Sequence, residues 1–180
     1  MPTFVKIASF TLNASSPSLV FSQIPQTYTN LHIIGSLRGT TSSNVEGITM
    51  RFNQDTSTNY LYELLQGYQQ FGAGSVVAAG SFSTTFRSSI YCGACAGNSN
   101  TANFFSALDI YIPNYKTSYR KRAIIRSAAD TTSTANFTWQ TDEVNAAWNS
   151  TGAITEIEIA PTSGSFAANS SLSLYGTLAA

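Results

Sequence analysis

Apolar and polar residues alternate in two stretches near the end of the sequence. In the first, residues 154–159, isoleucines alternate with Glu156 and Glu158, and in the second, residues 171–178, leucines recur on one side of the pattern. A period of two is typical of a β-strand that presents one face to a core and the other to water or a partner. A cluster of turn-forming residues at 161–164 separates the two stretches. The pattern therefore predicts a terminal β-hairpin.

The same periodicity recurs along the rest of the chain. It predicts further strands at residues 4–12, 19–21, 30–38, 48–52, 82–96, 104–113, 120–128 and 136–140. The spacing of apolar residues in 59–68 favours a short helix or an ordered loop over a strand, and 144–148 are predicted as a turn of helix. Residues 67–80 are rich in glycine and are predicted as a loop.

About nine to eleven short strands separated by loops of serine, threonine, asparagine and glycine are typical of an all-β protein. We expect an antiparallel β-sandwich of the jelly-roll kind, with at most one or two short helices and a single domain over residues 1–180. Charged residues make up only 10% of the chain and the formal net charge is zero. Such a surface resists self-association poorly, so we expect it to form permanent contacts with partners.

Two cysteines and one histidine are the first candidates for chemistry. Cys92 and Cys95 form a C-x-x-C motif, but a structural zinc site needs four ligands and His32 is the single histidine of the sequence. Free or buried thiols are the favoured interpretation, and a zinc ion shared between subunits is the alternative. No G-x-S-x-G motif accompanies His32, so this residue is interpreted as facing a partner or the surface.

Glu156 and Glu158 are the candidates for acid–base chemistry. Strand geometry places their side chains about 7 Å apart, a separation that would suit an inverting glycosidase. Catalytic pairs normally face each other across a cleft, however, and neighbours on one strand usually serve to solvate it. We therefore expect no enzymatic activity and no catalytic, cofactor or metal site.

Positive charge is concentrated between Lys116 and Arg126. Nucleic acid could bind such a strand, but the net charge is zero and no ladder of aromatic residues is interleaved with the basic ones. A surface that forms salt bridges with an acidic neighbouring subunit is the favoured interpretation. Aromatic residues in or beside the loops could stack on sugars or anchor a protein interface. The residues predicted to make contacts are Tyr68, Phe71, Arg120, Lys121, Arg122 and Trp148.

Three short motifs resemble a known group of proteins. They are I-P-x-x-Y-x-x-L at residues 24–31, R-F-N at 51–53 and S-L-Y-G at 173–176. Together they resemble the small virion structural proteins of tailed bacteriophages, which include capsid decoration (cement) proteins and the distal domains of tail fibres. The resemblance implies a β-sandwich within the particle and no active site.

The resemblance also implies a function and partners. We expect a decoration subunit, a homo-oligomer and by symmetry a trimer, that docks on the major capsid protein or other virion proteins. The alternative is a tail-fibre or baseplate module that recognises a glycan of the host surface. The absence of a coiled coil or attachment segment before the first strand favours the decoration subunit.

The expected location is the virion, after synthesis in the host cytoplasm. The N-terminal residues do not resemble a signal peptide, and no apolar run reaches the ~18 residues of a membrane helix. The surfaces expected to make contacts are the loop at 67–80, the basic strand at 120–126 and the edge near the N-terminal strand.

Overall fold

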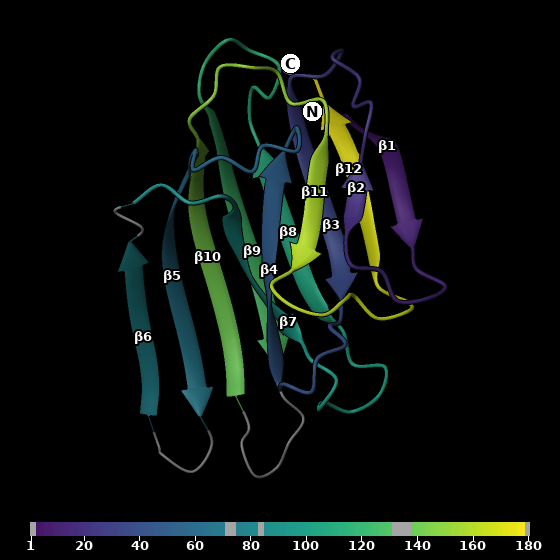
Figure 1. Cartoon of the computed structure of the whole chain (residues 1–180), viewed down its shortest axis with the longest axis vertical. Helices are drawn as coiled ribbons and strands as arrows, with labels where there is room; N and C mark the ends of the chain where they lie inside the picture. The colour runs from purple at the N-terminus through teal and green to yellow at the C-terminus, as the bar shows by residue number, and fades with distance from the viewer. Residues whose placement is uncertain (1–2, 71–74, 83–84, 131–137, 179–180) are drawn as a thin grey trace.

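The computed structural model describes residues 3–70, 75–82, 85–130 and 138–178. This part of the chain forms twelve β-strands and no helix (Figure 1). The strands are β1 (Phe4–Thr11), β2 (Leu19–Phe21), β3 (Asn30–Leu37), β4 (Val45–Phe52), β5 (Tyr60–Gln70), β6 (Ser75–Phe82), β7 (Ile90–Ala96), β8 (Ser106–Ile112), β9 (Lys121–Asp130), β10 (Thr138–Trp148), β11 (Ile157–Pro161) and β12 (Ser171–Thr177).

The strands form two sheets that pack as a sandwich. The larger sheet has eight strands in the order β1-β12-β3-β8-β9-β10-β5-β6, and the smaller has four in the order β2-β11-β4-β7. Every ladder between neighbouring strands is antiparallel. The structure thus confirms the predicted all-β antiparallel sandwich.

The connections give the sandwich a jelly-roll topology. If β1, β12 and the β9–β10 hairpin are set aside, the two sheets read β2-β11-β4-β7 and β3-β8-β5-β6. Along the chain, most connections between these eight strands pass from one sheet to the other. Two interlocked antiparallel sheets with such crossings are the arrangement of a double-sheet jelly roll. The extra strands widen the larger sheet.

Alternating side chains fill the space between the sheets. In β8 and β9, every second residue is buried, and the register places Ile110 beside Ile125 and then Val144 of β10 across the larger sheet. Each fully buried side chain of this kind contributes roughly 1.5–3 kcal/mol relative to leaving it in water. The hydrophobic effect therefore fixes which face of each strand points inward.

Four predictions about the middle of the chain were wrong. The predicted strand at 82–96 is not continuous, because Phe82 ends β6 and β7 begins at Ile90, while 83–84 lie outside the described residues. Residues 59–68 and 144–148 are not helical but lie mainly in β5 and β10, which pair in register along their whole length. Much of the predicted loop at 67–80 is strand as well, in the end of β5 and in β6, while 71–74 lie outside the described residues. Where a helix or a loop was predicted, pairing with neighbouring strands outweighs the local preference.

The predicted terminal hairpin is also wrong, although both of its strands exist. β11 pairs with β2 and β4 in the smaller sheet, whereas β12 pairs with β1 and β3 in the larger sheet. The connection after Pro161 therefore crosses between the sheets. On the way, Phe166 is fully buried and its backbone bonds to Ser16.

Candidate functional site

The most distinctive surface is the outer face of the larger sheet, the face turned away from the smaller sheet. Within the described residues no other element covers it. Large apolar side chains nevertheless point outward from it, with Phe4 55%, Ile34 47%, Ile124 42% and Tyr111 37% exposed. Scattered exposed apolar residues are ordinary, but a contiguous group on one face is typical of an interaction surface.

The strand register brings these side chains together. Across β12, β3, β8 and β9, Tyr175 lies beside His32, His32 beside Tyr111, and Tyr111 beside Ile124. The ring of Phe4 lies 5.6 Å from that of His32, measured between centroids, and the ring of Tyr111 meets His32 edge-on at 6.4 Å. We call Phe4, His32, Ile34, Tyr111, Ile124 and Tyr175 the aromatic patch.

One polar pair lies at the centre of the aromatic patch. His32 Nε2 is 2.7 Å from Asp109 Oδ1, and the His32 side chain is 17% exposed while that of Asp109 is 53% exposed. The neutral tautomer that donates from Nε2 satisfies the carboxylate. It leaves Nδ1 buried with no hydrogen-bond partner among the described residues. His32 thus faces the outer surface, within an apolar setting.

Charges of both signs surround the patch. In the next row of the sheet, Asp109, Arg126 and Glu143 lie side by side on β8, β9 and β10. Arg126 Nε is 3.6 Å from Glu143 Oε2, in a pair that is largely exposed. Because water screens such pairs, they contribute little to stability and can rearrange when a partner binds.

The aromatic patch is hollowed but has no deep pocket among the described residues. One hollow of about 210 Å³ is lined by Phe4, His32, Ile34 and Tyr175, and an adjoining one of about 320 Å³ reaches from Phe4 to Arg126. The first lies below the roughly 300–1,000 Å³ of sites that enclose a drug-sized ligand, and the second lies at the lower end of that range. The shape therefore suits a protruding side chain or a sugar ring better than an enclosed cofactor.

Not all basic residues of the strand predicted at 120–128 are exposed. Arg120 and Arg122 are exposed, as is Arg126, but Lys121 is only 1% exposed. Its Nζ donates to the backbone carbonyls of Thr117 and Tyr119 at 2.7 and 2.6 Å. Alternation along β9 turns this lysine toward the interior, so it does not contribute to a docking surface.

The three aromatic residues predicted to make contacts lie in different parts of the chain. Trp148 is buried, donates from Nε1 to Asp55 Oδ2 at 2.7 Å and stacks on Tyr60, so it belongs to the core rather than to the surface. Tyr68 lies in β5, in register with Gln140, and Phe71 lies outside the described residues.

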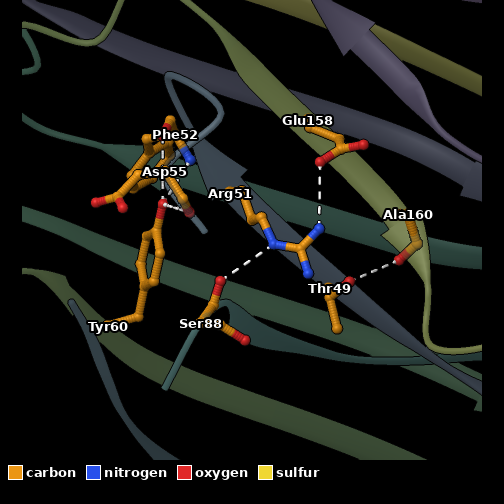
Figure 2. A network of polar contacts seen from close by, with 8 residues as sticks. All are labelled: Thr49, Arg51, Phe52, Asp55, Tyr60, Ser88, Glu158 and Ala160. Carbon is orange, nitrogen blue, oxygen red and sulfur yellow. Dashed lines mark hydrogen bonds and ion pairs between the residues drawn. The ribbon is translucent and has the colours of Figure 1, made fainter. Parts of the chain in front are cut away.

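The two carboxylates considered for acid–base chemistry lie by a hollow of about 480 Å³ on the smaller sheet. Arg51 holds Glu158 at 3.5 Å and also donates from Nε to the carbonyl of Ser88 (Figure 2). Nearby, the Tyr60 hydroxyl contacts the backbone of Phe52 (Figure 2). These contacts tie β4 to its neighbours, and they occupy Glu158 in an ion pair.

Both thiols are free and buried, as predicted. Gly93, with a φ of +92°, interrupts the regular strand between them, in a region where β4 and β7 shift register. Burial raises the pKa of the Cys92 thiol, and it raises that of Cys95 to about 12. The thiols therefore stay protonated. No cluster of potential metal ligands occurs within the described residues.

No protein-family model matches the chain, and no curated protein matches it. The described residues also include no helix with the length and hydropathy needed to cross a membrane.

Most residues of the aromatic patch were not predicted as contact residues, although the sequence contains a pattern that indicates them. Ile33 and Ile34 are adjacent, as are Ile124 and Ile125, and Ile110, Tyr111 and Ile112 form a run of three. In a strand with one buried face, one member of each adjacent pair must point outward. Adjacent apolar residues in several paired strands therefore indicate an exposed apolar patch.

Proposed function

We propose that this chain is a bacteriophage virion structural protein, a decoration subunit that docks on the assembled shell and stabilises it. The observation that supports this proposal best is the aromatic patch on the outer face of the eight-stranded sheet, a face that no other described element covers. A broad, slightly hollowed face with a central group of rings and a polar rim suits docking on another protein surface. The motifs that resemble virion proteins point the same way.

The jelly-roll topology is compatible with this proposal. Double-sheet jelly rolls are common in viral capsid proteins but also occur in lectins and cupins, so the fold does not decide between them. In the proposed mechanism, the patch binds a surface that exists only on assembled capsid protein. A protein that binds the assembled shell but not free capsid protein shifts the assembly equilibrium toward the shell. Many copies of a homo-oligomer act together through avidity.

The docking face can be tested with two matched variants. Ile124→Glu places a charge in the aromatic patch, and Val20→Glu places the same charge at a valine of similar exposure, 38%, on the smaller sheet. A carboxylate in an apolar interface must lose its hydrating water when the interface forms, and this loss is costly. We expect Ile124→Glu to weaken cosedimentation with shells stripped of this chain by at least about tenfold, and Val20→Glu to bind like the wild type.

Loss of binding in Val20→Glu alone would assign docking to the other sheet. Failure of the wild-type chain to bind stripped shells, or labelling of the chain on tails rather than shells in particle images, would contradict the decoration function.

The second candidate is recognition of a host-surface glycan, and the composition of the larger hollow of the patch favours it. Aromatic rings there adjoin Asp109, Arg126 and His32, and rings combined with charged hydrogen-bonding groups suit a sugar. We expect binding on a glycan array to be lost in Tyr111→Ala. It should persist in Tyr119→Ala, which removes a tyrosine that is 76% exposed outside the patch. Equal loss in both variants, or no reproducible sugar binding, would contradict this candidate.

A further inference from the structure

The larger sheet extends beyond the smaller one, and β6 lies at its far edge. The smaller sheet ends in β7, which packs mainly on β9 and β10. In Figure 1, β5 and β6 lie to the left of the smaller sheet. Within the described residues, β5 is the one strand with which β6 makes extensive contact. One side of β6 therefore presents backbone N–H and C=O groups that face no neighbouring strand in the described part of the chain.

The other three sheet edges are protected from pairing. On β1, Lys6 is exposed and the register shifts between Lys6 and Ala8. β2 is only three residues long. β7 is tied to the larger sheet through bridges near its two ends, from Ala96 to Arg38 and from Arg87 to Tyr60. Charged residues, bulges, short length and coverage are the usual means by which proteins block edge pairing.

β6 has none of these protections. It has eight residues, and its ladder with β5 continues without a register shift. Ser75–Phe82 contains neither proline nor lysine, and the sequence has no charged residue between Glu63 and Arg87. A long, regular, uncharged edge strand is a template for pairing with another strand.

We propose that β6 pairs antiparallel with β6 of a second copy of this chain, so that the larger sheets of two copies become continuous. The partner must offer an unprotected, uncharged edge, and a second copy offers one at β6 and at no other described edge. Identical strands that pair antiparallel are related by a two-fold axis, and such a contact closes after two copies. Pairing at β6 therefore produces a dimer rather than a fibre.

This pairing concerns how the copies associate, whereas the shell-docking proposal concerns the aromatic patch. It replaces the expected trimer with a two-fold unit. The test of β6 pairing measures self-association with no shell present, so a negative result does not contradict shell docking. In the same way, a failure of shell docking does not contradict β6 pairing.

The experiment measures molar mass against concentration by sedimentation equilibrium. We expect the wild type to reach twice the 19.3-kDa chain mass. Ala78 lies near the middle of β6, so in a two-fold pair it lies close to its own copy. Ala78→Lys and Ala78→Glu each place like charges across the interface, and we expect each to weaken the dimer about tenfold. An equimolar mixture of the two variants should restore association, because the opposite charges then meet.

The control is Val20→Lys, which adds the same charge to the short edge strand β2 and should leave the mass unchanged. Hydrogen exchange of the wild type gives a second readout that needs no variant: residues 75–82 should exchange more slowly in the dimer than after dilution. A monomer at all concentrations, a trimer, or a mixture that stays monomeric would overturn the proposal, as would unchanged exchange across 75–82.

Discussion

Two buried cations have their hydrogen bonds satisfied by backbone carbonyl groups. The Arg38 guanidinium donates to the carbonyls of Thr101, at 2.5 Å, and of Asn100, at 2.9 Å. Lys121 donates to carbonyls at the turn before β9, and burial lowers its pKa. Removing a charge from water is costly unless its donors are satisfied. These residues therefore fix loop conformations, which explains why charge in this sequence does not by itself indicate a binding surface.

A third polar residue, Asp55, makes stability depend on acid pH. Burial would raise the pKa of Asp55, but hydrogen bonds from Ser57, Trp148 and Asn59 outweigh it and lower the pKa to about 2. A carboxyl group with a depressed pKa stabilises the fold above its ordinary pKa of 3.8, and this stabilisation is lost as the pH falls toward the folded value. The free energy of unfolding should therefore fall between about pH 4 and pH 2.

The variant Asp55→Asn should remove this dependence. Because Asp55 is only partly buried, we expect a loss of roughly 1–2 kcal/mol at pH 7 and a flatter decline below pH 4, both measured by urea unfolding at a series of pH values. Glu143→Gln, in an exposed ion pair, is the control and should change neither quantity by more than a few tenths of a kcal/mol. An unchanged acid slope in Asp55→Asn would show that other groups cause the decline.

At the scale of the strand, the alternation of apolar and polar residues predicted most of the strands but not which strands pair with one another. β3, β8 and β9 have strict periodicity over much of their length, and the sequence located them within a few residues. β5 was misread because Leu61, Leu64 and Leu65 fit both a helix and a strand. On one side β5 pairs with β10, which lies far away in the chain, so a local pattern does not contain that ladder. On the other side it pairs with β6, which follows it in the chain but whose residues were predicted as a loop.

The same limit applies to the terminal strands and to the candidate site. The alternating residues identify β11 and β12 as strands. A connection rich in turn-forming residues has the same sequence pattern whether it closes a hairpin or crosses between sheets. The aromatic patch depends on register across several strands, which brings Tyr111 of β8 beside His32 of β3. Of its members, only His32 was considered as a possible partner contact from the sequence.

At the scale of the molecule, the path of the chain links the two sheets. The chain passes from β2 to β3 and from β3 to β4, and later from β10 to β11 and from β11 to β12, changing sheet each time. Each sheet thus contains neighbouring strands that are far apart in sequence, such as β3 and β12 in the larger sheet and β4 and β11 in the smaller one. Neither sheet can separate without exposing the apolar side chains that both share, so we expect the whole sandwich to unfold as one unit.

This cooperativity can be tested with a single tryptophan as the reporter of contact between the sheets. Trp148 of β10 in the larger sheet lies 5.6 Å from Phe52 of β4 in the smaller sheet, measured between ring centroids. In Trp139→Phe, Trp148 is the one remaining tryptophan. We expect its fluorescence and the far-UV circular dichroism of the strands to change at the same urea concentration, as in a two-state transition. The wild type should give the same dichroism midpoint, which establishes that the substitution is neutral. Loss of the Trp148 signal at a lower urea concentration than the dichroism would instead show that the sheets separate before they unfold.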